Sequence, residues 1–173
     1  MRQDSPTPRI PERFARDLPA SCTQVLLVLI DADTASSGNL WLLERGVAAD
    51  SWLSVAGPMP VSIGRNGLAW GAGEHRVQAP PGFRRKQEGD GCSPAGIFRI
   101  PFAFGYAPTA PGLHLKYVPV TRTLMGVDDA RSCYYNQIVD TASVASDWTS
   151  HETMLREDGL YRWGAFVAHN PAN

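Results

Sequence analysis

The stretch VLLVLI, residues 25–30, is the longest uninterrupted apolar run in the chain. Its six residues suit one β-strand, and they fall far short of the roughly 18 that a membrane-spanning helix needs. Because every position is apolar, the run predicts a strand that is buried on both faces, or nearly so. Asp31-Ala32-Asp33 ends this strand, and residues 40–44 are predicted to pair with it as a hairpin.

Other short apolar segments lie between glycine and proline turns, and they predict a mostly-β fold. The 173 residues include 16 Gly and 14 Pro, which favours a turn-rich β protein over a helix bundle. Further strands are expected at 52–56, 61–63, 68–70, 97–101, 113–118 and 161–168, the last of them apolar on both faces and central. One short helix is predicted at 149–158, because Thr149 and Glu152 have capping-box spacing and Gly159 follows.

The N-terminal segment, residues 1–21, holds four prolines and alternating charges, and we interpret it as an extended tail along the body of the protein. Residues 22–173 show no repeat and no internal boundary, so they are predicted to form one domain. The N-terminus lacks the apolar segment of a secretory signal.

The charge balance argues against a nucleic-acid partner. The chain has 16 basic and 17 acidic side chains and a formal net charge of −1, whereas non-specific binding to phosphate needs an excess of Lys and Arg. No two of the three cysteines share a CxxC spacing, and no two histidines lie three or four residues apart. The sequence therefore predicts no local metal motif.

Cys22, Cys92 and Cys133 are interpreted as inert thiols, since a free cysteine is most often a small buried hydrophobe. A cysteine hydrolase that uses Cys133 is the alternative, and it lacks a base placed nearby in the sequence.

The loop from Lys86 to Gly96 belongs to the longest stretch without periodicity, residues 71–96. It could cradle a phosphate, but no Gly-Lys-Ser/Thr closes it. The other interpretation is a backbone corner, in which glycines allow positive φ and Glu88 and Asp90 accept free N–H groups.

Several blocks together resemble the catalytic domain of bacterial L,D-transpeptidases. KQEGDGCSPAGIF, residues 86–98, resembles the family signature K-x-E-G-D-G-x-[ST]-P-A-G-x-F, and Phe104-Gly105-Tyr106 fits the segment after it. VDDARSCYYNQIVD, residues 127–140, is similar to the family's D-D-x-x-S-x-x-Y-N block. Residues 147–170 look like the segment that ends in His-Asn, and residues 63–71 also fit, so the resemblance covers about residues 22–170.

The resemblance implies a mostly-β sandwich or barrel that acts on peptidoglycan stem peptides in the periplasm or cell envelope, without a cofactor. In this family a Cys thiolate attacks the peptide bond after diaminopimelate, releases D-alanine and passes the acyl group to an amine. The residues that the resemblance assigns to substrate binding are Lys86, Glu88, Gly89, Asp90, Ser93, Tyr106, Tyr135, Asn136, His169 and Asn170. Lys86–Gly96 and Tyr134–Asn136 are expected to meet at one polar groove.

The chain departs from the family at the catalytic block, a His followed by T-x-G-C, which follows His-Asn in the family. No position of this sequence matches that Cys or that His, so neither role is assigned to any residue. The expectation is an incomplete domain that is inactive as given. The alternative is a non-catalytic module that binds peptidoglycan peptides.

Overall fold

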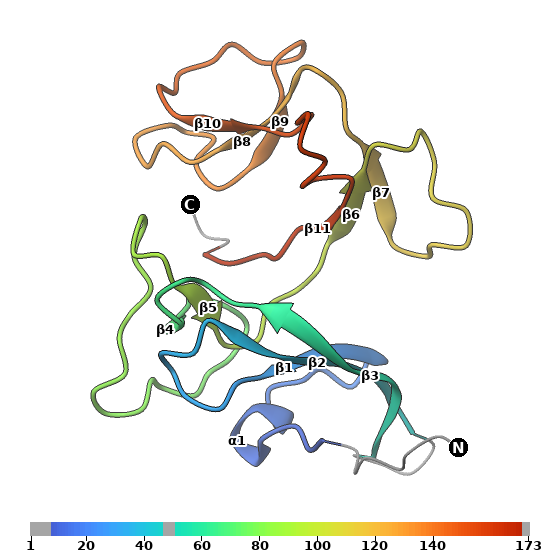
Figure 1. The fold of residues 1–173 in the computed structure, drawn as a ribbon, viewed down its shortest axis with the longest axis vertical. Coiled ribbons are helices and arrows are strands. Elements are labelled where there is room, and N and C mark those ends of the chain that lie inside the picture. The colour runs from blue at the N-terminus through green and yellow to red at the C-terminus, as the bar shows by residue number, and fades with distance from the viewer. Residues whose placement is uncertain (1–7, 47–50, 171–173) are drawn as a thin grey trace. The chain divides into compact units, whose positions relative to one another are not determined.

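The computed structural model describes residues 8–46 and 51–170, which form eleven strands and one four-residue helix (Figure 1). The prediction of a mostly-β protein with one short helix is confirmed. The described strands form three sheets of three strands and one pair, and no sheet among them closes into a barrel. Within these ranges no helix has the length and apolar character to cross a membrane. The chain divides into two compact units, residues 1–97 and 98–173.

The first unit is built on an antiparallel sheet of β1 (Gln24–Leu29), β2 (Ser37–Arg45) and β3 (Trp52–Ser62). The predicted hairpin is confirmed, with Leu26 opposite Leu42. β3 does not end at residue 56 as predicted, because register shifts between Leu40 and Leu43 let the pairing with β2 continue through Gly57-Pro58 to Ser62. The strand expected at 61–63 is therefore the end of β3.

The β1–β3 sheet buries one face, so the prediction of a strand buried on both faces is wrong. Burial alternates along β1, and Leu26 and Val28 remain 47% and 41% exposed. Leu43 on β2 lies opposite Val25 and is 0% exposed. Successive side chains of a strand point to opposite faces of the sheet, so the apolar residues of β1 divide between a covered face and an exposed face. Because residues 25–30 are all apolar, the sequence does not show which face of the sheet is exposed.

The N-terminal segment contains the helix of this structure, α1 (Glu12–Ala15). Phe14 stacks on Trp70 with ring centroids 5.9 Å apart, and the Asp17 carboxylate accepts the N–H of Arg76 at 2.8 Å. These contacts attach the described part of the segment to the body of the unit, while residues 1–7 lie outside the described residues. Trp70 ends β4 (Leu68–Trp70), which pairs in parallel with β5 (Ser93–Ala95).

The second unit holds two three-stranded sheets around a small apolar core. Its strands are β6 (Phe102–Gly105), β7 (Lys116–Pro119), β8 (Leu124–Val127), β9 (Ile138–Asp140), β10 (His151–Thr153) and β11 (Trp163–Ala165), in the orders β11-β6-β7 and β10-β8-β9. Phe104, Val120, Leu124 and Met154 form the buried cluster. The strand predicted at 97–101 is absent, because β6 begins only at Phe102, and the strand predicted at 113–118 begins later than expected, at Lys116.

The predicted helix at 149–158 is absent, and β10 with its turns occupies that segment. Both the backbone N–H and the hydroxyl of Thr149 donate to Asp129 Oδ2, at 2.9 and 2.8 Å, so Thr149 caps no helix. Glu152 lies opposite Gly126 in the antiparallel pair of β10 and β8. A carboxylate twenty residues away thus outcompetes the local capping box for the donors of Thr149.

The last strand is short and lies at a sheet edge, which corrects the prediction of a central strand at 161–168. β11 pairs with β6 alone among the described strands, and Trp163 is 60% exposed. Beyond β11 the chain stays next to β6, since the N–H of Phe166 donates to the carbonyl of Phe102 at 3.0 Å.

We expect Leu43→Ala to lower the free energy of unfolding by about 2–5 kcal/mol, because it leaves a cavity under the one buried face of the sheet. Leu53→Ala is the matched control: Leu53 is 60% exposed, and its loss should change stability by less than about 0.5 kcal/mol. Chemical denaturation measures both, and equal effects would contradict the assignment of Leu43 to the core.

Candidate functional site

The loop that opens the family-like signature is held by the carboxylate of Asp90. Its Oδ1 accepts the Lys86 ammonium at 2.7 Å and the N–H of Cys92 at 2.8 Å, and its Oδ2 accepts the N–H of Gln87 at 2.8 Å. Partial burial disfavours the ionised carboxylate, but these hydrogen bonds and the nearby ammonium outweigh it and lower the pKa of Asp90 to about 2. The loop is the backbone corner that the sequence allowed.

The other predicted residues of this loop also bind their own neighbours. Glu88 Oε1 accepts the N–H of Gly89 at 3.1 Å, and Ser93 Oγ accepts the N–H of Gly64 at 2.9 Å. Gly89 and Gly91 have φ of 71° and 68°, the left-handed region that glycine adopts without steric cost. These polar groups stabilise the loop conformation, and the first unit thus brings together Lys86, Glu88, Gly89, Asp90 and Ser93.

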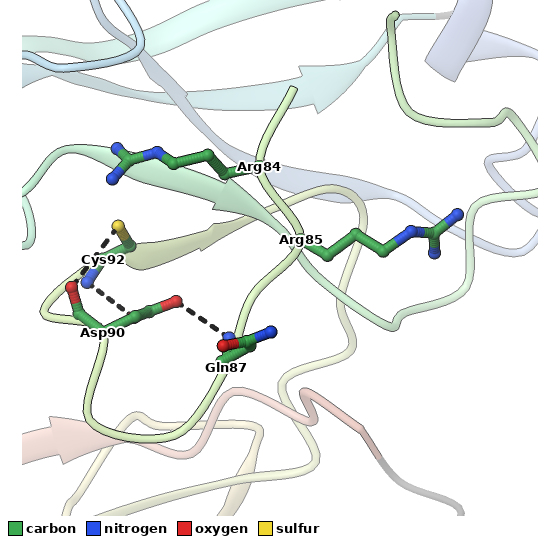
Figure 2. Close-up of a pocket in the computed structure, with 5 residues that line it drawn as sticks. All are labelled: Arg84, Arg85, Gln87, Asp90 and Cys92. Carbon is green, nitrogen blue, oxygen red and sulfur yellow. Dashed lines mark hydrogen bonds between the residues drawn. The ribbon is translucent and has the colours of Figure 1, made fainter. Parts of the chain in front are cut away.

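A cavity of about 290 Å³ beside this loop is lined by Arg84, Arg85, Gln87, Asp90 and Cys92. Figure 2 shows the guanidinium groups of Arg84 and Arg85 extending in opposite directions. Arg84 donates to the carbonyl of Asn66 at 2.6 Å. The two cations therefore do not converge on one anion, and Cys92, which is only 8% exposed, sits as a small buried thiol.

The second unit contains a cavity of about 360 Å³ in which two sequence blocks meet. Asn136 comes from the Tyr-Asn block and His169 and Asn170 from the His-Asn block, and all three line it. The Asn136 side-chain amide donates to the carbonyl of His169. Asn136 and Asn170 have φ of 62° and 55°, a conformation that Asn tolerates better than most residues. The fold thus brings three predicted site residues to one place.

The remaining wall of this cavity is largely apolar, and the sequence did not single out its residues. Phe102 and Phe166 stack with ring centroids 5.0 Å apart and an interplanar angle of 11°. Gln137, Ile138 and Ala168 complete the lining. The only signal for these residues is that Phe102 follows the strand predicted at 97–101 and Phe166 lies within the strand predicted at 161–168. Their pairing across 64 residues depends on the register of β11 and β6.

Two further predicted residues of the second unit do not line the cavity. The Tyr106 hydroxyl donates to the carbonyl of Arg156 and accepts its N–H, both at 3.0 Å, so Tyr106 holds a turn. The N–H of Tyr135 donates to the carbonyl of Ser132 within the Tyr-Asn loop. The shared groove expected for Lys86–Gly96 and Tyr134–Asn136 stays a prediction, since the two segments belong to different units.

The Asp-Asp block is a structural clamp. Hydrogen bonds from Thr149 and Arg131, first through their backbone N–H groups, hold the pKa of Asp129 well below its usual range. Asp129 thus accepts turn backbone N–H groups, a common use of Asp side chains. In the described ranges, Oδ1 of the neighbouring Asp128 is buried without a hydrogen-bond partner.

Asp147 controls the exposed thiol of Cys133. Its carboxylate accepts the Ser132 hydroxyl at 2.5 Å and the N–H of Cys133 at 3.0 Å, and these contacts lower the pKa of Asp147. Hydrogen bonding to Asp147, desolvation and the carboxylate charge raise the pKa of the Cys133 thiol. A thiol with a raised pKa forms less thiolate at neutral pH, so the arrangement opposes nucleophilic use of Cys133.

Across residues 8–46 and 51–170, no group of three or more His, Cys, Asp or Glu side chains is placed to hold a metal ion. Comparison with known proteins finds no family model, no curated protein and no solved structure that matches the chain. The functional argument therefore rests on the residues and their geometry.

We expect Asp90→Asn to destabilise the folded protein at neutral pH. The pKa of Asp90 is depressed to about 2 in the folded state, so its stabilisation is present above the unfolded pKa of about 4 and is lost as the pH falls through about 2. The difference in unfolding midpoint between parent and variant should shrink over that interval. Asp31→Asn, at an exposed carboxylate, is the control, and a difference independent of pH would contradict the role of the charge.

Iodoacetamide should modify Cys133 at neutral pH more slowly than it modifies a cysteine in an unstructured peptide, because Asp147 disfavours the thiolate. Asp147→Asn should accelerate the reaction several-fold. Peptide mapping by mass spectrometry resolves Cys133 from Cys22 and Cys92. Labelling faster than the peptide standard would revive the hydrolase interpretation.

Proposed function

We propose that this chain is an L,D-transpeptidase-like protein of peptidoglycan remodelling, and that the cavity of its second unit binds a stem peptide. The observation that carries the proposal is the meeting of Asn136 with His169 and Asn170 at one cavity. These residues come from two separate blocks that resemble the family. The same substrate would place the protein in the periplasm or cell envelope.

The chemistry of the cavity suits a short peptide. Asn136, Gln137 and Asn170 bear side-chain amides, which offer donors and acceptors to peptide groups, and Phe102 and Phe166 offer an apolar wall to alkyl side chains such as the methyl of D-alanine. A volume of about 360 Å³ lies at the lower end of the range of ligand pockets, roughly 300–1,000 Å³. Part of a stem peptide would fill it.

The proposal is for binding by these residues and not for acyl transfer by them. Covalent transfer needs a thiolate at the bound peptide. His169 lines the cavity, but the lining includes no cysteine, and the pKa of the Cys133 thiol is raised. A non-catalytic peptidoglycan-binding module is the second candidate, supported by the absence of a cysteine from the lining. Detection of an acyl-enzyme by mass spectrometry would reject this second candidate.

We expect Asn136→Gly to weaken binding of a tetrapeptide that carries diaminopimelate and terminal D-alanine by about five- to tenfold, the loss of roughly one hydrogen bond. Glycine keeps the backbone conformation at φ 62° while removing the amide. Calorimetric titration measures the affinity. Lys116→Ala, on the exposed surface of β7, should leave the affinity unchanged.

If Asn136→Gly and the parent bind the peptide with equal affinity, the peptide does not bind at this cavity. No binding by the parent protein, confirmed as folded by its unfolding transition, would reject the proposed function.

A further inference from the structure

One edge of the β1–β3 sheet offers an unpaired row of backbone groups. The N–H of Arg45 donates to the carbonyl of Thr23, so Thr23 and Arg45 form a hydrogen-bonded pair of the ladder between β1 and β2. Hydrogen-bonded and non-hydrogen-bonded pairs alternate along an antiparallel ladder, so the N–H and C=O groups of Leu26 and Val28 point away from β2. β1 is an edge strand, and no described strand pairs with its outer side, where the Gln24 carbonyl accepts the Cys22 thiol at 3.3 Å. Two donors and two acceptors of this short strand therefore lack a partner.

The side chains next to this edge are also unusual for an exposed strand. Leu26 and Val28 are 47% and 41% exposed, and Leu53 and Met59 on the same sheet are 60% and 42% exposed. β1 contains no charged residue and no proline, the two devices that usually protect an edge. The sequence of β1 is that of a covered strand, and the described part of the chain leaves it uncovered.

The opposite edge of the same sheet is protected. Met59 pairs with Leu40, and the N–H of Ile63 donates to the carbonyl of Ser36, so the intervening Pro60 presents its nitrogen to the free side of β3. A proline nitrogen carries no hydrogen, so this position donates nothing to an incoming strand. The sheet consequently has one edge that accepts a new strand well.

We propose that β1 pairs with β1 of a second copy of this chain, antiparallel and centred on Leu26. In that register Leu26 faces its own counterpart and Gln24 faces Val28 of the other copy. The outward groups of all three residues then form hydrogen bonds across a two-fold axis. The result is a continuous six-stranded sheet whose exposed apolar residues form one surface.

A second copy fits this edge for two reasons. The strand is uncharged, so two identical strands meet without like-charge repulsion. Because Pro60 obstructs the other edge, addition stops after one pairing and gives a closed dimer instead of a growing fibre. A six-residue ladder buries less than the roughly 1,200 Å² of a standard interface, so the dimer should be weak, with a Kd in the micromolar range or above.

Sedimentation velocity of the full chain over a range of concentrations tests the proposal. The parent should move from monomer toward dimer as its concentration rises. Val28→Pro removes one outward N–H without touching the ladder to β2, and it should weaken dimerisation by about tenfold or more. Ser62→Pro makes the same change at the outer side of β3 and should leave dimerisation unchanged. A parent that stays monomeric, or equal effects of the two variants, would overturn the proposal.

A second pair of variants keeps the test valid if the proline variant fails to fold. Leu26→Lys and Leu26→Glu each place like charges across the proposed axis, so each alone should be monomeric. An equimolar mixture of the two should dimerise, because opposite charges then face each other. Failure of the mixture to associate, while both variants remain folded, would reject the register. None of these measurements involves the peptide-binding cavity, so their outcome is independent of the proposed function.

Discussion

Carboxylates that accept backbone N–H groups hold the loops of both units, and most of the remaining structure depends on them. With strands of three or four residues in much of the chain, many N–H groups find no partner in a sheet. Asp90 satisfies two of them in the first unit, and Asp129 and Asp147 satisfy three in the second. These backbone hydrogen bonds lower the pKa values of Asp90 and Asp129, and the Ser132 hydroxyl together with the N–H of Cys133 lowers the pKa of Asp147.

This constraint also shapes what the thiols and the cavity can do. The carboxylate of Asp147 orders the loop that leads to Asn136, and the same charge makes Cys133 a poor nucleophile. Ordering the loop positions the Asn136 amide against the carbonyl of His169. The loop that places Asn136 at the cavity is thus also the loop in which the pKa of the Cys133 thiol is raised.

The two edges of the β1–β3 sheet are protected unequally. β3 carries a proline on its outer side, whereas β1 exposes Leu26 and Val28 and contains neither a charged residue nor a proline. Edge protection is a property of the sheet and not of either strand alone. Whether an edge is protected can be judged only once the strand register shows which backbone groups point outward.

The sequence by itself determined the strand-rich class and the β1–β2 hairpin and left a backbone corner at Asp90 as one of two interpretations, because period, turn residues and local capping act over a few residues. Only the tertiary structure decided that Thr149 would serve Asp129 instead of a helix, and that β1 would bury one face. It also decided that Asn136 and His169, 33 residues apart, would meet. Such contacts depend on competition between distant donors and acceptors and on which faces are covered, and neither is encoded in a local pattern.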